Sequence, residues 1–372
     1  MADGRGWWTP QERGGADRGL EISDYKGAGA GRELSKPELT PARNNTPHHR
    51  HGRNVGLPEC TRSFYGCSVK FALRSPASCR PGLTLCAVLA FELLAMTTLS
   101  FAADNSLQLV LRSRPEARPG VFVLTEKKTE WDPKKTALII CDMWDDHWCK
   151  SASRRVAEMA GPLNEVVRQA RARGVFIIHA PSSVTSFYKD TPQRRRAQTA
   201  PFVKTPVPLA TAERWGTAWC WTDPRHERVL PIDDSDMGCS CVGIKCTIRE
   251  AWKRQIATIE LAPEDALTDD GQETWNLLAA RGLENVILCG VHLNMCVLGR
   301  PFAIRQQVYL GKKVALLRDF TDTMYNPERP PGVDHFTGTD LVVEHVEKHW
   351  CPTFTSSDLT GQPPFRFKED RR

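Results

Sequence analysis

Four short apolar runs constrain the fold of this chain more than any other feature. They lie at residues 136–141 (TALIIC), 175–179 (VFIIH), 286–291 (VILCGV) and 314–318 (VALLR). Continuous apolar runs of this length indicate strands that are buried on both faces. A weaker strand is predicted at 256–261, and helical spacing occurs at 153–173, 271–281, 297–310 and 340–349. The alternation predicts an α/β fold: a doubly wound parallel sheet of five or six strands with helices on both faces.

The first 103 residues have a different character. Residues 1–80 are rich in glycine, arginine and proline without a sustained period, and we expect them to be disordered or to be an upstream extension. Residues 81–103 combine a preceding Arg80, an apolar run and a Ser-Phe-Ala-Ala exit, which is typical of a secretory signal peptide. A membrane span is the alternative, but Glu92 lies in mid-run and the length is barely sufficient. We therefore expect an exported protein, periplasmic or secreted, that is free of the membrane after cleavage.

A signal peptide normally begins near the start of a chain, whereas this one begins about 70 residues in. We expect the true start to lie later, with Val69 as the candidate start residue. Beyond the signal peptide we expect a hairpin and linker at 104–133, the main α/β domain at 134–355 and a C-terminal tail at 356–372. The hairpin strands are predicted at 107–112 and 120–124.

A long insertion at 182–250 interrupts the domain. It contains three tryptophans, and we interpret it as a lid or wall over a pocket for a flat or aromatic substrate: Trp215, Trp219 and Trp221. Its cysteines favour disulfides in an exported protein, with a metal site as the alternative, although their spacing matches no common zinc pattern: Cys220, Cys239, Cys241 and Cys246. We expect no cofactor and no metal. The modest net charge of +6 does not indicate a nucleic-acid partner.

Two reactive residue types follow the buried strands. Asp142 comes directly after the run 136–141, and Cys296 begins the predicted helix after the run 286–291. The carboxyl ends of parallel strands form the usual active-site edge of such a sheet. A thiol at a helix N-terminus next to a carboxylate can serve as a nucleophile with its base. The alternative is a buried structural cysteine and a helix-capping aspartate.

The motif around Cys296 points to a family. The run 281–297 (RGLENVILCGVHLNMCV) resembles the nucleophile segment of the isochorismatase-like cysteine hydrolases, which include nicotinamidases, and 136–144 (TALIICDMW) resembles their first strand. The resemblance implies that Cys296 is the nucleophile and Asp142 the base. It also implies a cis peptide between Val291 and His292, with the backbone N–H groups of His292 and Cys296 as an oxyanion hole. The family reaction is attack on an amide or related C–N bond through a thioester.

The lysine that completes the family triad is missing. It should lie at the end of the third strand, but residues 258–271 (TIELAPEDALTDDG) contain no lysine. Arg254 is the candidate replacement, and a surface cation is the alternative. We assign Trp144, His179 and Asn294 to the substrate pocket. Because His179 is the single histidine where nicotinamidases carry their zinc-binding signature, we expect no zinc of that type.

These patterns support two functions from different classes. One is an exported cysteine hydrolase acting on a small-molecule amide. The other is a non-catalytic relative that has lost the triad lysine and binds a small ligand or a protein. Thiol redox chemistry through Cys239 and Cys241 has less support, because Cys-x-Cys alone is not a redox motif. A homo-oligomer is compatible with such a fold.

Overall fold

The computed structural model describes residues 105–209 and 223–372. The chain divides into two units, 1–83 and 84–372, and all described residues belong to the second. The predicted extension (1–80), Val69, the signal peptide (81–103), Cys220 and the three insertion tryptophans therefore lie outside the described residues. Within the described ranges, no helix combines the length and the apolar character that crossing a bilayer requires.

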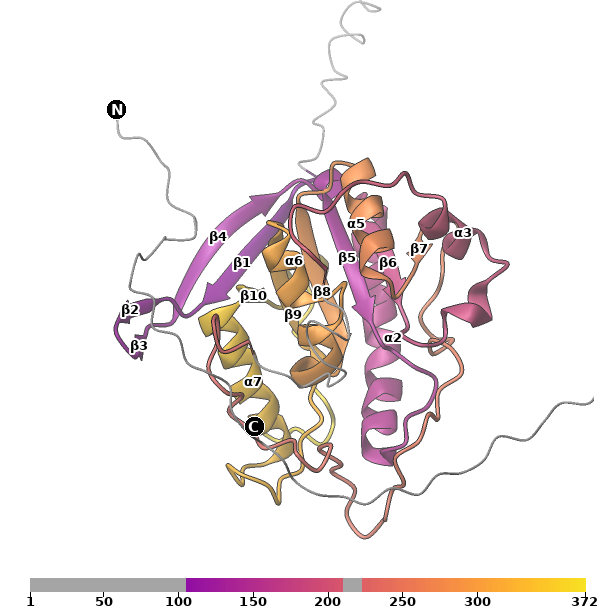
Figure 1. The fold of residues 1–372 in the computed structure, drawn as a ribbon. Helices are drawn as coiled ribbons and strands as arrows, with labels where there is room; N and C mark the ends of the chain where they lie inside the picture. The colour runs from indigo at the N-terminus through magenta and orange to yellow at the C-terminus, as the bar shows by residue number, and fades with distance from the viewer. Residues whose placement is uncertain (1–104, 210–222) are drawn as a thin grey trace, which may run out of the picture. The chain divides into compact units, whose positions relative to one another are not determined.

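An eight-stranded sheet forms the centre of the domain, in the order β4-β1-β10-β9-β8-β5-β6-β7 (Figure 1). The last six strands of this order run parallel. The predicted parallel sheet of five or six strands is thus confirmed. These six are β10 (Thr353–Phe354), β9 (Lys313–Asp322), β8 (Asn285–Val291), β5 (Thr136–Cys141), β6 (Phe176–Ala180) and β7 (Ala266–Leu267).

Each face of the sheet carries its own apolar core, because side chains alternate along a strand. Ile139 of β5 belongs to one cluster and its neighbour Leu138 to the other. The first cluster includes residues of α5 (Gly271–Ala280), α6 (Ile304–Tyr309) and α7 (His335–His349). The second includes residues of α2 (Lys150–Ala172) and α8 (Ser357–Thr360). Helices on both faces match the doubly wound prediction.

The predicted hairpin exists, but its second strand was misplaced. β1 (Leu107–Ser113) pairs antiparallel with β4 (Thr125–Trp131), and it also joins β10 at Arg112 and Thr353. The stretch predicted at 120–124 contributes only β3 (Val121–Phe122), which pairs with β2 (Glu116–Arg118). β4 is an edge strand with four charged residues in seven, TEKKTEW. Charges protect an exposed edge from pairing with other chains, and they also hide the strand from an apolar pattern.

Three other expectations differ from the structure. Residues 256–261 do not form a strand, and the third parallel strand along the chain is instead the two-residue β7. The helix predicted at 297–310 is two pieces, the π-helical turn η3 (Leu293–Val297) and α6, because Pro301 lies between them. The predicted tail, 356–372, packs against the domain through the buried Leu359 and Phe367.

The described parts of the insertion are anchored to the sheet's helices. They contain the short helices η2 (Thr185–Tyr188) and α3 (Pro192–Gln198). Glu227 is buried and accepts hydrogen bonds from Arg305 Nε at 2.7 Å and from His345 Nε2 at 2.7 Å. These contacts tie the insertion to α6 and α7.

Candidate active site

Asp142 lies at the carboxyl end of β5 in a fixed and unusual backbone conformation. Its φ of 46° is left-handed, and its side chain is fully buried. Asp142 Oδ1 accepts the backbone N–H of Ser182 at 2.6 Å. Burial raises the pKa of Asp142, and the positive charge of Arg300 is the largest influence that opposes this rise. The strand end therefore presents a carboxylate whose ionisation depends on one cation.

Cys296 meets Asp142 from the neighbouring strand. The Val291–His292 peptide at the end of β8 is cis, as the family resemblance implied, and Cys296 follows in η3. Gly290 allows the two strand ends to approach, because a Cβ there would lie 2.0 Å from the carbonyl oxygen of Cys141. Burial raises the pKa of the Cys296 thiol, and the negative charge of Asp142 raises it further. These influences favour the protonated thiol in the resting site.

Arg300 supplies the cation of this site. It follows Cys296 by one turn, with its N–H donating to the Cys296 carbonyl at 3.0 Å. Its Nε lies 3.9 Å from Asp142 Oδ2, and its side chain is 23% exposed. The sequence prediction missed Arg300 because the family lysine belongs to another strand. The signal that could have found it is its spacing of four residues from Cys296, which places two side chains on one side of a helical turn.

The structure places Arg254 elsewhere. Its Nε lies 3.9 Å from Asp145 Oδ2, its side chain is 44% exposed, and its guanidinium lies 5.7 Å from the Phe187 ring centre. Arg254 therefore has the position of the surface cation that was its alternative interpretation. The two arginines differ in burial although each lies 3.9 Å from an aspartate.

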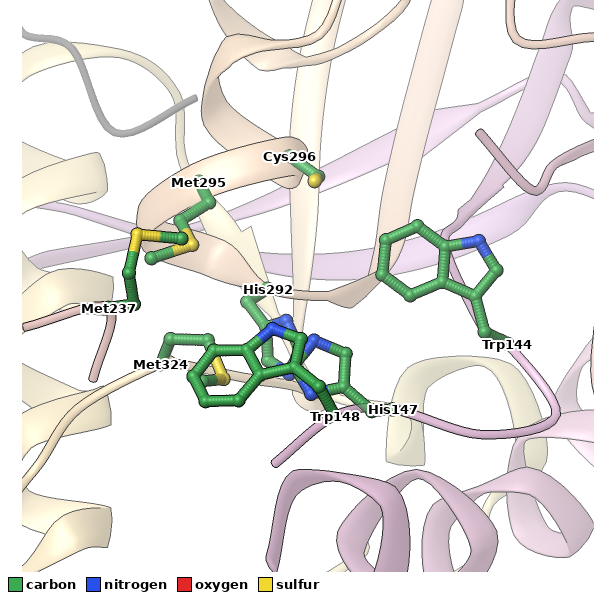
Figure 2. Close-up of a pocket in the computed structure, with 8 residues that line it drawn as sticks. All are labelled: Trp144, His147, Trp148, Met237, His292, Met295, Cys296 and Met324. Atoms are coloured by element: carbon green, nitrogen blue, oxygen red, sulfur yellow. The ribbon is translucent and has the colours of Figure 1, made fainter. Parts of the chain in front are cut away.

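A small pocket opens beside the thiol (Figure 2). The space between its lining residues is about 250 Å³, a volume that includes open solvent. Trp144, which the sequence assigned to the pocket, is one wall: its ring stacks on Trp252 at 4.3 Å, and its Nε1 donates to the Ser182 carbonyl at 3.2 Å. In Figure 2 the Cys296 sulfur lies between Trp144 and a group of methionines. The lining residues are Trp144, His147, Trp148, Met237, His292, Met295, Cys296 and Met324.

Two neutral histidines also line the pocket. His147 Nδ1 accepts the Cys149 N–H at 3.1 Å, so the neutral ring carries its proton on Nε2. Burial lowers the pKa of His147 to about 4 and that of His292 well below its usual range. Among the described residues, the buried Nε2 of His292 has no hydrogen-bond partner. An unpartnered ring nitrogen in a pocket wall is suited to a polar group of a ligand. In the sequence, the one feature that could have indicated His147 is its proximity to Asp142.

His179 and Asn294 do not line the pocket, contrary to the sequence prediction. His179 pairs in register with Ile140, and Ile140 belongs to the apolar cluster on the face of the sheet away from Cys296. His179 Nδ1 lies 3.0 Å from Gln255 Oε1, and His179 Nε2 lies 3.0 Å from Asp265 Oδ2. The Asn294 side-chain amide accepts a hydrogen bond from the backbone N–H of Met324 at 2.9 Å and donates one to the Met324 carbonyl at 3.1 Å. Both residues have structural contacts that consume their polar atoms.

Comparisons with known proteins add the following. No family model and no curated protein matches the chain. Solved structures that match include a cysteine hydrolase from Pseudomonas syringae (18% identity, 61% of this chain and 92% of that one, TM-score 0.38). They also include isochorismatase-family proteins from Pseudomonas putida (12%, 62% and 92%, TM-score 0.36) and Burkholderia thailandensis (14%, 61% and 94%, TM-score 0.34). All three TM-scores lie below 0.5, so the family interpretation rests on the sequence motifs and the site.

Proposed function

We propose that the protein is a cysteine hydrolase that cleaves a small amide or a related C–N bond. The observation that carries the proposal is the placement of the buried Asp142 and the buried Cys296 after the ends of two paired strands, with Arg300 Nε 3.9 Å from Asp142 Oδ2. A thiol hydrogen-bonded to a carboxylate is a nucleophile and its base in one unit. Cys296 is one of the residues that line the adjacent pocket.

The chemistry follows from the positions of these groups. Asp142 takes the thiol proton as Cys296 Sγ attacks the substrate carbonyl. The backbone N–H groups of His292 and Cys296 are our candidates to stabilise the oxyanion. The tetrahedral intermediate collapses, the C–N bond breaks, and Asp142 returns the proton to the leaving amine. Water, deprotonated by Asp142, then hydrolyses the thioester and restores the thiol.

Arg300 has an electrostatic role in this scheme. A guanidinium stays protonated at any working pH, so it cannot exchange protons as a lysine can. Its charge favours the ionised form of Asp142 and of the Cys296 thiolate. The proton transfers therefore fall to Asp142 alone.

The test is hydrolysis of a panel of small aromatic and aliphatic carboxamides, followed by ammonia release. We expect the wild type to cleave at least one amide and Cys296→Ala to be inactive. Cys289→Ala is the matched control, because Cys289 is also a buried cysteine but lies in β8 and belongs to the opposite apolar cluster. Cleavage that survives in Cys296→Ala would overturn the proposal. Amides that bind without cleavage would favour the non-catalytic alternative.

We also propose that the protein is exported, on the strength of the apolar run 83–103 and its flanks. N-terminal sequencing of the protein from its native host tests this. A mature chain that begins near residue 104 is expected, and one that begins well before residue 95 would contradict export by this signal.

A further inference from the structure

Four cysteines from distant parts of the sequence meet beside the pocket. Cys149 is the N-cap residue of α2, whereas Cys239, Cys241 and Cys246 belong to the insertion. Cys149 Sγ lies 3.3 Å from Cys239 Sγ and 3.7 Å from Cys241 Sγ. The sulfurs of these three residues all lie within 4.8 Å of one another, and Cys246 Sγ lies 3.4 Å from Cys241 Sγ. All four are free thiols in the structure.

The separations of the sulfurs indicate what the cluster can hold. A disulfide requires about 2.05 Å between sulfurs. Four sulfurs at about 2.3 Å from a tetrahedral zinc ion lie about 3.8 Å from one another. The observed 3.3 to 3.7 Å are much closer to the metal geometry. The disulfides that the sequence favoured for Cys239, Cys241 and Cys246 are not formed in this arrangement.

The surroundings of the cluster supply hydrogen bonds to sulfur. Cys241 Sγ accepts the backbone N–H of Ser151 at 3.2 Å and its hydroxyl at 3.2 Å, both from the first turn of α2. Donors of this kind stabilise metal-bound thiolates, which carry negative charge. The first turn of a helix adds its own positive potential. The cluster is therefore prepared for anionic sulfur.

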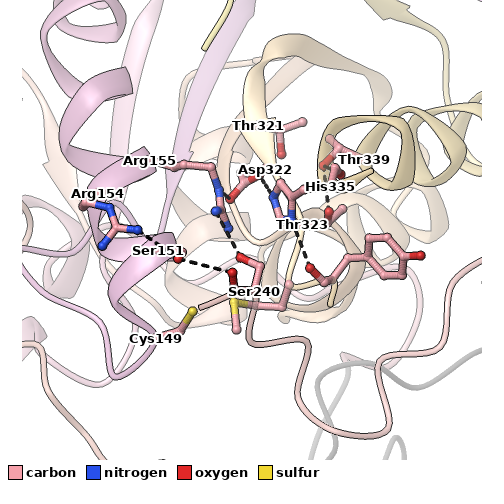
Figure 3. Close-up of polar contacts among 12 residues, drawn as sticks. Cys149, Ser151, Arg154, Arg155, Ser240, Thr321, Asp322, Thr323, His335 and Thr339 are labelled. Atoms are coloured by element: carbon pink, nitrogen blue, oxygen red, sulfur yellow. Dashed lines mark hydrogen bonds and ion pairs between the residues drawn. The ribbon is translucent and has the colours of Figure 1, made fainter. Parts of the chain in front are cut away.

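Buried charges fix the segment that carries two of the ligands (Figure 3). Arg155 Nη1 donates to Ser240 Oγ at 3.2 Å, while its Nε donates to Asp322 Oδ2 at 2.7 Å. His335 Nε2 lies 2.8 Å from the other oxygen of Asp322. Ser240, between Cys239 and Cys241, is thus tied to the end of β9 and the start of α7. A ligand set held this way loses little conformational freedom when an ion binds.

We propose that Cys149, Cys239 and Cys241 bind a zinc ion, and that Cys246, whose sulfur lies 3.4 Å from Cys241 Sγ but outside the group of three, moves in as the fourth ligand. The ion would displace the thiol protons into solvent and change no oxidation state. The Cys-x-Cys-x4-Cys segment takes its remaining ligand from a residue ninety positions earlier. This separation explains why the spacing alone matched no common zinc pattern.

The ion would set the shape of the pocket without taking part in the reaction. Met237 lines the pocket and precedes Cys239 by two residues, while His147 and Trp148 line it and directly precede Cys149. A bond through metal between these two segments would join two parts of the chain that line the pocket. The inference does not depend on whether Cys296 is a nucleophile.

Metal content tests the proposal directly. The full chain is purified under reducing conditions without chelators, exposed to zinc, desalted and analysed by inductively coupled plasma mass spectrometry. We expect about one zinc ion per chain for the wild type and a loss of most of it in Cys241→Ser. Cys351→Ser is the matched control and should keep its zinc, because Cys351 is a buried thiol outside the cluster.

A second measurement needs no variant to fold. Cobalt added to the metal-free wild type should produce the intense visible absorption of a tetrahedral site and the near-ultraviolet bands of sulfur-to-cobalt charge transfer. A wild-type chain that binds neither ion, or whose intact mass shows disulfides among these cysteines under the same conditions, would overturn the proposal. An unchanged cobalt spectrum in Cys246→Ser would overturn the assignment of the fourth ligand. Neither readout depends on hydrolysis, so this proposal and the proposed function can fail separately.

Discussion

Replacing Arg300 with methionine removes the cation from Asp142 while leaving a long apolar side chain in its place. Arg300 Nε lies 3.9 Å from Asp142 Oδ2, and the arginine is mostly buried. At an effective dielectric constant of about 20, two unit charges at that distance attract by about 4 kcal/mol. Part of this is offset by the desolvation of the arginine, so we expect a net loss of about 3 kcal/mol. In kcat/KM that is a reduction on the order of 100-fold.

The pH dependence of the variant distinguishes an electrostatic role from a structural one. Burial already raises the pKa of Asp142, and Arg300 is the main influence that restrains the rise. Without Arg300 the pKa of Asp142 rises further. Because Asp142 must be ionised to accept the thiol proton, the acid limb of the kcat/KM profile should move to higher pH. Arg300→Lys, which keeps a positive charge, should restore part of the activity and of the profile.

Arg254→Met is the matched control for this experiment. Arg254 also lies 3.9 Å from an aspartate, Asp145, but it is substantially exposed. An exposed pair contributes little, so we expect kcat/KM to change by less than about twofold. The assay is the steady-state rate on an amide that the wild type cleaves. The reasoning is refuted if Arg254→Met loses activity while Arg300→Met retains it, or if the pH profile of Arg300→Met is that of the wild type.

Three further experiments test other parts of the structure. Glu227→Gln should lower the free energy of unfolding in urea by about 3 kcal/mol. Despite burial, the hydrogen bond from His345 holds the pKa of Glu227 low, so the stabilisation by the Glu227 carboxylate is lost as pH falls through that pKa. The stability of the variant should not show this loss at acid pH. Gly290→Ala should lower the free energy of unfolding by more than about 3 kcal/mol, because its new Cβ would clash with Cys141. The control Gly282→Ala has open space and a φ of 62°, and it should lower the free energy of unfolding by about 1 kcal/mol. Equal losses in the two variants would contradict this reasoning. His292→Phe should raise KM for a cleaved amide about tenfold, since it removes the unpartnered ring nitrogen, and an unchanged KM would exclude that contact.

The parallel core of the sheet could be predicted because its strands are buried on both faces. β5 and β8 have no exposed residue, so the apolar runs at 136–141 and 286–291 carry the whole signal. The edge of the sheet could not be predicted in the same way. β4 is charged along its length and β7 has only two residues, so neither offers a pattern long enough to detect.

Some residues of the site could be predicted from the sequence and others could not. Asp142 and Cys296 follow predicted strands, and a motif locates them in the sequence. Arg300 was missed because its position depends on the turn that follows Cys296, and the search was directed to the third strand. His179 was misassigned because the strand end gives its position along the sheet but not its face; the face follows from its register with Ile140. The face of the sheet to which each β6 side chain points is set by the register with its neighbouring strand, which a single sequence does not reveal.

A covalent intermediate on Cys296 is the most direct test of the central claim. The wild type, Cys296→Ala and Cys289→Ala are mixed with p-nitrophenyl acetate, a small activated acyl donor, quenched in acid during turnover and mapped by peptide mass spectrometry. Attack by the thiol releases p-nitrophenolate and leaves one acetyl group as a thioester. We expect this acetyl group on the Cys296 peptide of the wild type and of Cys289→Ala, and a loss of nitrophenolate release in Cys296→Ala. Acetylation confined to other residues, with the same release rate in Cys296→Ala, would contradict the assignment of Cys296 as the nucleophile.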